Sequence, residues 1–326
     1  MDQQDLAIAV DLGGTNLRVA VVDAAGVVLH RVRELTQAHL GPENAVERLV
    51  HILSSLARSA GADRLVGLGV SVASPVDPNT GIMYNPPSLP GWDGFSLKPV
   101  LEAAFHLPVC LANDATLAAV GEHAYGIGVG VANLVYMTIS TGIGGGVLID
   151  GHPVMGAGGF ASEIGHMSID RNGRPCKCGN VGCLETLASG TALASRVRER
   201  LAEGAVSVLG DLFGDDLRGL GAREVMRAAS QRDPLAVEVV EQFARDLGLG
   251  IVNLLNVFDP QVVILGGGVC NSLHVFYPLL RAEVHQHAMS HMKGRIPLAL
   301  SVLGDDAALL GAAYQVFQRE RREGRG

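Results

Sequence analysis

The sequence lacks any apolar run as long as the roughly 18 to 20 residues that cross a bilayer, although 48% of its 326 residues are hydrophobic. It therefore predicts a globular protein without a membrane partner. Basic residues are also scarce, because 25 Lys and Arg stand against 33 Asp and Glu, a formal charge of −8. Nucleic-acid affinity depends on Lys and Arg that neutralise phosphates, so this balance disfavours a nucleic-acid partner. Met1 to Asp5 carry two acids and no basic stretch, so we expect no secretory signal and a cytoplasmic location.

Cysteine is scarce as well, and its spacing is uneven. Three of the five cysteines fall within eight positions, at 176, 178 and 183. An odd number with such clustering favours metal ligation over a disulfide framework. Glycine is abundant by contrast, with 42 residues. Many of them stand in short clusters beside strands, where the backbone has to approach another group closely.

The length and one internal repeat predict two lobes around a cleft. A chain of 326 residues exceeds what one typical core supports. Strand patterns at 6–10 and 17–22 flank a glycine turn, and the same unit recurs at 133–140 and 146–150. We expect an α/β fold with a small N-terminal lobe at 1–115, joined by the C-terminal helix at about 303–326, and a large lobe at 116–302.

The first glycine turn has the residue types of a phosphate-binding loop. Asp11 ends a strand and is followed by Gly13, Gly14, Thr15 and Asn16. The glycines let the backbone reach phosphate oxygens, the next two side chains add donors, and the carboxylate can hold a hydrated Mg²⁺. The alternative is an ordinary hairpin turn, since the same residues are common there.

Two further glycine clusters strengthen the phosphate-binding interpretation. A second turn, at 140–146, includes Thr141 and Gly142, and a third cluster follows an apolar strand as Gly266, Gly267 and Gly268. The third cluster suits close passage beside an adenine and a ribose. The spacing is neither that of a Rossmann fingerprint nor that of a P-loop.

Asn113 and Asp114 stand where a strand ends and a helix begins. A carboxylate at this junction can accept the proton of a sugar hydroxyl as the hydroxyl attacks phosphorus. The same Asp could instead be the N-cap of the helix, a role worth about 1 kcal/mol. The dipeptide alone leaves both interpretations open.

The most specific motif is a set of metal-ligand residues. His166, Cys176, Cys178 and Cys183 supply the ligands of a tetrahedral Cys₃His zinc site with no position open to water, so the zinc is expected to be structural. The alternative is three reduced thiols in a glycine loop. Glu163 and Glu185 bracket the motif and could bind sugar hydroxyls, or they could be solvated surface acids.

Three residues outside the motifs have simpler interpretations. Trp92, in the Pro/Gly-rich segment at 74–94, either stacks on a sugar or anchors the loop, and anchoring is favoured. Cys110 and Cys270 are expected to pack as small apolar residues.

With these motifs in order, the chain resembles the ROK family of sugar kinases from about residue 6 to residue 314. The resemblance lies in D-L-G-G-T-N at 11–16, V-D-P-x-T-G at 76–81, L-P-G-W at 89–92, A-N-D-A at 112–115, S-T-G-I-G-G-G at 140–146, E-I-G-H at 163–166, C-x-C-G-x-x-G-C-L-E at 176–185 and L-G-G-G at 265–268. It implies the duplicated actin-like, hexokinase-like (ribonuclease H-like) ATPase fold, with ATP on the glycine turns and the zinc loop in the large lobe. It also implies that Asp114 is the base and that Asn113, Glu163, His166 and Glu185 contact the sugar. A homodimer or a dimer of dimers, with most of its surface on the large lobe, is implied too.

Two departures from the family pattern fall on the sugar side, at Ser74 and Ser88. Ser88 stands where many members have an asparagine, and a shorter donor leaves room for a water or a bulkier substituent. We expect a hexokinase that phosphorylates the 6-hydroxyl of glucose, with N-acetylglucosamine or N-acetylmannosamine as the alternative acceptors. A sugar-responsive transcriptional repressor is the alternative of another class, disfavoured because the phosphate hairpin starts within ten residues of Met1.

Overall fold

The computed structural model describes residues 5–214 and 216–323. Residues 1–4 of the expected first lobe and 324–326 of the expected last helix lie outside the described residues. The described chain forms two compact units, one made of 1–132, 146–162 and 301–326, the other of 133–145 and 163–300. The lobe boundaries expected at 115 and 303 stay predictions, because these two compact units need not coincide with the lobes of a duplicated fold.

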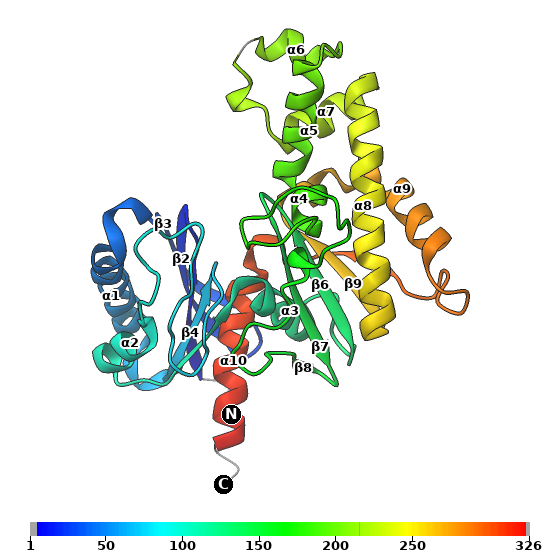
Figure 1. Cartoon of the computed structure of the whole chain (residues 1–326). Helices are drawn as coiled ribbons and strands as arrows, with labels where there is room; N and C mark the ends of the chain where they lie inside the picture. Colours follow the sequence, from blue (N-terminus) through cyan, green and yellow to red (C-terminus); the bar gives the residue numbers. More distant parts are fainter. Residues whose placement is uncertain (1–4, 215, 324–326) are drawn as a thin grey trace. The chain divides into compact units, whose positions relative to one another are not determined.

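The first unit is built on a sheet with the strand order β3-β2-β1-β4-β5. β1 pairs antiparallel with β2 and parallel with β4. Figure 1 shows α1 and α2 on one side of this sheet and α10 on the other. The elements of this unit include β1 (Leu6–Leu12), β2 (Asn16–Asp23), β3 (Val28–Leu35), α1 (Gly41–Ala60), β4 (Leu65–Val72), α2 (Leu97–Phe105), β5 (Val109–Asn113), α3 (Asp114–Tyr125), β8 (His152–Pro153) and α10 (Ala307–Glu323).

The two faces of β1 differ in side-chain size, and this difference decides which helix covers each face. Leu6, Ile8, Val10 and Leu12 alternate into the core shared with α1, whereas the intervening alanines join the core shared with α10. Alternation follows from the two-residue period of a strand. Because alanine is small, α10 lies close to the sheet.

Glycines bring α10 equally close to α3. A Cβ at Gly311 of α10 would lie 1.8 Å from the carbonyl oxygen of Leu117, and one at Gly121 of α3 would lie 2.1 Å from that of Ala307. Neither position has room for a side chain. The helix that begins at Asp114 is therefore held directly against the C-terminal helix.

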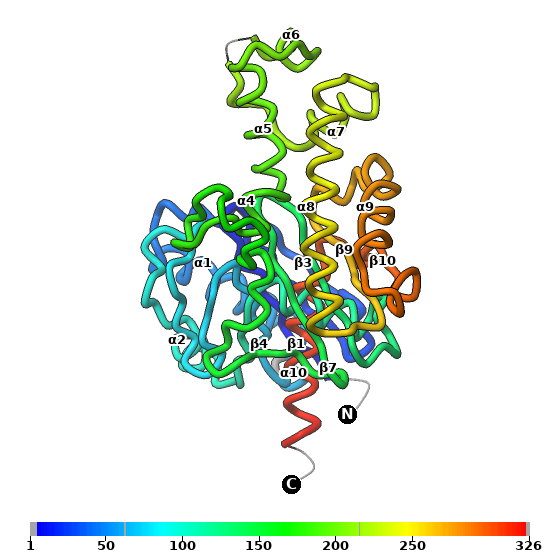
Figure 2. The backbone as a smooth tube through the Cα atoms, turned by 45° about the vertical axis from the view of Figure 1, so that its right-hand side comes forward, coloured from blue at the N-terminus to red at the C-terminus, as the bar shows by residue number. Residues whose placement is uncertain are grey.

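The second sheet has the order β10-β9-β6-β7-β8, and α8 lies beside α9 in both views (Figures 1 and 2). α8 keeps an apolar stripe over its length, with Pro at its start and the Asp233 side chain as its N-cap. The elements here include β6 (Leu134–Ile139), β7 (Ile143–Ile149), α4 (Leu184–Ala188), α5 (Gly190–Ala202), α6 (Val208–Phe213), α7 (Ala222–Ser230), α8 (Pro234–Phe258), β9 (Val262–Gly266), α9 (Leu273–His287) and β10 (Leu298–Leu300).

The two sheets have the same topology. Read as β8-β7-β6-β9-β10, the second order matches β3-β2-β1-β4-β5 position by position. The parallel pairs also correspond, β6 with β9 and β9 with β10 in one sheet, β1 with β4 and β4 with β5 in the other. The duplication predicted from the repeated strand and glycine-turn unit is confirmed.

Two smaller expectations can be checked against burial. Trp92 is 0% exposed and packs in the core of the first unit with Leu89 and Leu97, so it anchors its loop. Cys270 is buried, and half-buried Cys110 packs against the α10 core. Among residues 5–214 and 216–323, no helix combines the length and the apolar character needed to span a bilayer.

Candidate active site

The phosphate-type hairpin of the first unit is closed by its own backbone and held from β3. The N–H of Gly13 donates to the Asn16 carbonyl at 3.0 Å, and the Thr36 hydroxyl donates to the Gly13 carbonyl at 2.6 Å. The N–H of Thr36 also donates to the Thr15 carbonyl at 2.9 Å. Thr36 is 1% exposed. The turn is therefore fixed from outside, while Thr15 at its tip is exposed.

Asp11, the last residue but one of β1, is a nearly buried acid, 8% exposed. The Ser71 hydroxyl donates to its Oδ1 at 2.9 Å, and Arg18 Nε lies 3.3 Å from its Oδ2. Burial raises the pKa of Asp11, and Arg18 and Ser71 act in the opposite direction. Each carboxylate oxygen has a second lone pair, so Asp11 can still accept from a water on a cation.

Sequence reasoning missed both partners of Asp11. Ser71 and Arg18 are its direct neighbours in register, on β4 and on β2. Side chains directly opposite on adjacent strands lie on one face, a few ångström apart. The sequence could have identified Arg18 and Ser71 only if the pairing of β1 with β2 and β4 had been assumed.

The strand-to-helix junction resolves one alternative that the sequence left open. The N-cap of α3 is Asn113, whose Oδ1 accepts from the N–H groups of Ala115 and Thr116. Asp114 is the first helical residue, and its Oδ1 accepts from Ala115 N–H at 2.8 Å. The capping role therefore belongs to Asn113, and the interpretation of Asp114 as the cap is wrong.

Two loops of the first unit meet this junction and the hairpin. Asn113 Nδ2 donates to the Ser74 carbonyl at 3.3 Å. Ser74 itself is 2% exposed, and its hydroxyl donates to the Pro75 carbonyl. Ser88 lies against Gly14 at the hairpin turn. The structure thus brings Ser74, Ser88, Asn113 and the hairpin together in one unit.

In the second unit, two segments contact Ile143, which follows the glycine turn after β6. The N–H of Ile143 donates to Glu185 Oε2 at 2.9 Å. A Cβ at Gly165 would lie 2.0 Å from the Ile143 carbonyl oxygen, so the segment holding Glu163 and His166 packs directly on the turn. Glu185, expected to face a sugar, has one carboxylate oxygen committed to this turn.

Glu163 lies half-buried beside these groups. Burial raises the pKa of its carboxyl, the nearby His166 lowers it, and Glu185 raises it. The two glutamates expected from the sequence are thus close enough to influence each other.

The other glycines of this unit fit against β6. A Cβ at Gly266 would lie 2.2 Å from the Tyr136 hydroxyl, and one at Gly267 would lie 2.4 Å from the Ile139 carbonyl oxygen. Gly268 is exposed and has Ser140 Oγ 3.8 Å from its would-be Cβ. Thr141 is exposed as well, and its carbonyl accepts from Thr191 Oγ1 at 2.8 Å. Close packing therefore explains the first two glycines, and the open surface begins at Gly268.

The four predicted metal ligands converge on one point. The ligand atoms of His166, Cys176, Cys178 and Cys183 all lie within 4.8 Å of one another. Cys176 Sγ is 3.6 Å from His166 Nδ1, and Cys178 Sγ is 3.7 Å from Cys183 Sγ. A tetrahedral zinc with metal–sulfur bonds of about 2.3 Å has sulfur–sulfur edges of about 3.8 Å. The donor set and its spacing fit zinc.

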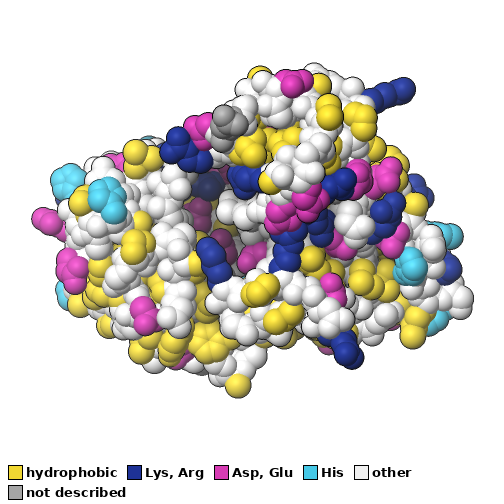
Figure 3. Space-filling view, turned by 45° about the horizontal axis from the view of Figure 1, so that its top comes forward, with side chains coloured by type: hydrophobic (Ala, Val, Ile, Leu, Met, Phe, Trp, Pro, Cys, Tyr) yellow, Lys and Arg dark blue, Asp and Glu magenta, His cyan; other side chains and the backbone are white. Residues whose placement is uncertain are grey.

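The loop that holds these ligands is tied to neighbouring helices through charges. Arg174 of the loop binds Glu199 of α5 through two nitrogens, at 2.8 and 2.5 Å. Arg196 of α5 in turn binds Asp246 of α8 at 2.5 Å, which joins the two helices. Figure 3 shows basic and acidic side chains gathered beside one another on the face in view. The Arg174–Glu199 pair therefore links the loop to α5.

Comparisons with known proteins agree with the duplicated fold. A glucokinase from Halalkalibacterium halodurans is 33% identical over 324 residues, 98% of this chain and 97% of the relative. A putative xylose repressor from Caldicellulosiruptor is 32% identical, covering 96% of this chain and 78% of the repressor. The crystal structure of a ROK family glucokinase from Streptomyces griseus in complex with glucose and AMPPNP has a TM-score of 0.79 and 31% identity, covering 96% of this chain and 99% of that one.

These likenesses define the chain as an α/β protein with the duplicated actin-like, hexokinase-like ATPase fold. The chain belongs to the ROK family, which it matches over residues 7–319. The glucokinase relatives support a sugar kinase, and the complex with AMPPNP supports the use of ATP.

Proposed function

We propose that this chain is an ATP-dependent hexokinase that transfers the γ-phosphoryl group of ATP to the 6-hydroxyl of glucose. The observation that carries the proposal is the division of roles at the start of α3. Asn113 caps α3 through the N–H groups of Ala115 and Thr116, so the cap does not depend on Asp114, whose Oδ1 shares the Ala115 N–H. The N-terminus of a helix keeps a carboxylate in its first turn ionised, and the ionised form is the one that can accept a proton as a general base.

The reaction that we propose is a direct transfer. The oxygen of the sugar hydroxyl attacks the γ-phosphorus, the bond from this phosphorus to the oxygen that bridges it to the β-phosphate breaks, and ADP leaves. The hydroxyl proton passes to Asp114. Asn113, Glu163, His166 and Glu185 would orient the sugar, with Ser74 and Ser88 beside them.

The phosphates would be bound by backbone N–H groups and short side chains. In the first unit these are Gly13, Gly14, Thr15 and Asn16. The second unit would supply Thr141 and Gly142 for the phosphates and the exposed end of the cluster at 266–268 for the nucleoside. Asp11 would hold a hydrated Mg²⁺, which neutralises phosphate charge when it is bound.

Glu185 would serve two parts of the site. One carboxylate oxygen accepts from the Ile143 N–H of the second glycine turn, and the other oxygen is available for a sugar hydroxyl. Zinc on His166, Cys176, Cys178 and Cys183 would be structural, because four protein ligands complete a tetrahedron. The zinc would therefore set the position of Glu185 through the loop that ends at α4.

A substrate panel tests the proposal. Coupled ADP release would be measured with glucose, N-acetylglucosamine, N-acetylmannosamine, mannose and fructose. We expect the highest kcat/KM for glucose, and a preference for an N-acetylated sugar would instead show that the short Ser88 side chain makes room for the acetamido group. Turnover of none of the five sugars would overturn the kinase proposal.

The repressor alternative and the assembly state are tested separately. If the chain were a transcriptional repressor, as some of its relatives are named, gel-shift assays with promoter DNA, with and without sugar, would reveal DNA binding. We propose a homodimer or a dimer of dimers in the cytoplasm. Sedimentation velocity of the purified chain would check the assembly.

A further inference from the structure

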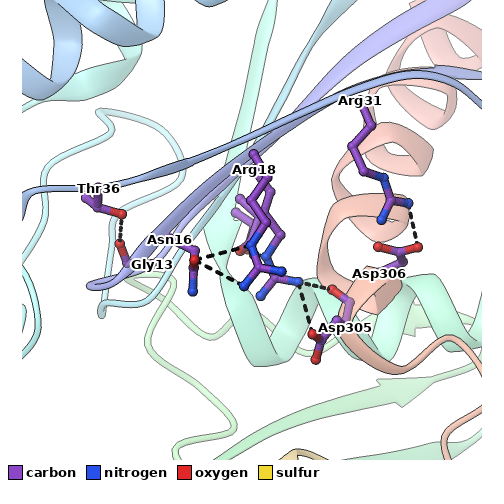
Figure 4. Close-up of polar contacts among 10 residues, drawn as sticks. Gly13, Asn16, Arg18, Arg31, Thr36, Asp305 and Asp306 are labelled. Atoms are coloured by element: carbon purple, nitrogen blue, oxygen red, sulfur yellow. Dashed lines mark hydrogen bonds and ion pairs between the residues drawn. The ribbon is translucent and has the colours of Figure 1, made fainter.

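Two arginines face each other beside the phosphate-type hairpin. Arg18 of β2 and Arg33 of β3 are direct partners in the antiparallel register. Like charges at such positions destabilise a sheet. Figure 4 shows Arg18 next to Asn16 at the start of β2, with the contacts of both residues. Their placement therefore requires compensation for two positive charges.

The charge of Arg18 is compensated and that of Arg33 is not. Arg18 lies near two carboxylates, Asp11 at 3.3 Å and Asp305 at 3.9 Å, and it donates to the Asp305 carbonyl at 2.6 Å. Within the part of the chain that the structure describes, Arg33 forms no ion pair. Its Nε and Nη2 donate to the neutral Asn16 Oδ1 at 3.3 and 3.2 Å.

The nearest arginines make the contrast sharper. Arg31, two residues away on the same face of β3, pairs with Asp306 at 2.6 Å. Arg48 of α1 pairs with Glu34 at 2.8 Å. Acids are thus available around this sheet edge, and Arg33 alone of these arginines is held by an amide instead.

The amide contact orients the guanidinium without neutralising it. One edge, Nε and Nη2, binds Asn16, which leaves the Nη1 side of this exposed residue facing away from that amide. A guanidinium presents paired N–H groups that match two phosphate oxygens. Asn16 belongs to the hairpin assigned to the nucleotide phosphates, so the uncompensated charge lies at that hairpin.

From this geometry we propose that Arg33 is a phosphate-binding residue for the nucleotide, held in place by Asn16. The inference rests on the proposed function, because it takes ATP as the ligand of the hairpin. The ligand chemistry is the charged end of a nucleoside triphosphate. The effect should therefore grow with the number of phosphates.

The test compares binding of AMP, ADP and ATP, each with Mg²⁺, by titration calorimetry to the full chain, to Arg33→Gln and to Arg33→Lys. Arg31→Gln is the matched control, since it removes the same charge from the same face. We expect Arg33→Gln to weaken ATP binding roughly tenfold or more, ADP less and AMP hardly at all. Arg33→Lys should lie between, because it keeps the charge and loses the paired geometry. Arg31→Gln should change ATP binding by less than about twofold.

Two results would overturn the role of Arg33 while leaving the kinase proposal intact. One is wild-type ATP affinity in Arg33→Gln. The other is an equal loss for AMP, ADP and ATP, which would mean that Arg33 only supports the hairpin, and a lowered Tm of Arg33→Gln would accompany it. A wild-type chain that bound no ATP would overturn both proposals.

Discussion

Gly14 lies so close to Ser88 that Gly14 has no room for a side chain. A Cβ at Gly14 would lie 2.5 Å from the Ser88 Cβ and 2.7 Å from the Ser88 carbonyl oxygen. Gly14 is at the turn assigned to phosphate, and Ser88 is in the loop assigned to the sugar. The two binding loops of the first unit are therefore in direct contact.

This contact predicts that Gly14→Ala impairs the use of both substrates. The new methyl group must displace a backbone oxygen, so the hairpin and the Ser88 loop both shift. We expect KM for ATP and for the sugar to rise together, each by about tenfold, as misplacement of binding groups commonly costs. Gly13→Ala is the control, because its Cβ meets only the Asn16 carbonyl at 3.3 Å, and it should lose less. A change in KM for ATP alone would show that the loops are independent.

Asp114→Asn preserves the shape of the junction and removes the base. Binding of ATP and sugar should stay close to wild type, because Asn113 still caps α3. The value of kcat should fall by about 10² or more. Steady-state kinetics and calorimetry together give both quantities. Comparable turnover in the variant would remove Asp114 from its proposed role.

Removal of the metal should loosen one defined segment. Cys178→Ser takes away a proposed ligand that lies 3.7 Å from Cys183, so this variant should not retain the zinc that we propose for the wild-type chain, measured by atomic emission. Hydrogen exchange should then accelerate over residues 160–190, and KM for sugar should rise because Glu163 and Glu185 adjoin this loop. Cys270→Ser, in the same unit but outside the cluster, should keep the zinc. A wild-type chain purified without zinc and unaffected by chelators would contradict the prediction.

Asp11 should make stability fall as pH rises. Burial raises its pKa in the folded chain, so the folded state binds this proton more tightly than the unfolded state. Stability from this group is complete below the ordinary pKa of about 4 and is lost as pH rises through the raised value. Asp11→Asn does not titrate. The free energy of unfolding of wild type minus that of Asp11→Asn should therefore decrease from pH 4 upward in urea denaturation, and an increase would contradict the assignment.

Glu122 should be the costliest glutamate to truncate. It is 0% exposed and accepts from the Ser301 hydroxyl at 2.5 Å, from Leu303 N–H at 3.0 Å and from Ile127 N–H at 3.0 Å. Glu122→Ala leaves these donors without an acceptor, which should lower the free energy of unfolding by roughly 3 kcal/mol or more. Glu47→Ala, at an exposed site on α1, should change it by less than about 0.5 kcal/mol. Equal losses of stability for the two variants in urea denaturation would show that the donors around Glu122 find other acceptors when it is removed.

Local patterns in the sequence predicted several parts of this structure. Strand alternation and glycine turns predicted both strand, turn and strand units. The His and Cys motif predicted the four ligand atoms that lie together. These features depend on neighbours close in the chain. Whether Asp114 was a base or the cap of the helix stayed open because Asp favours the cap position, and only the backbone shows that Asn113 takes it.

What the sequence could not reveal depends on distant partners. Ser301 is 179 residues from Glu122 in the sequence. An acid within an apolar helix does not indicate which distant residue will donate a hydrogen bond to it. The same holds for Glu185, whose contact with Ile143 spans 42 residues. Ser74, expected on the sugar side, is buried, and its hydroxyl donates a hydrogen bond to the carbonyl of the next residue, Pro75.

The packing of Gly311 against Leu117 has a consequence for synthesis of the chain. During translation the helix that begins at Asp114 emerges long before α10, which begins at Ala307. Until α10 has been made, the side of α3 that packs against it is uncovered, and Asp114 at the start of α3 lacks that support. We expect fragments that end before α10 to lack the contact that fixes α3 in the whole chain.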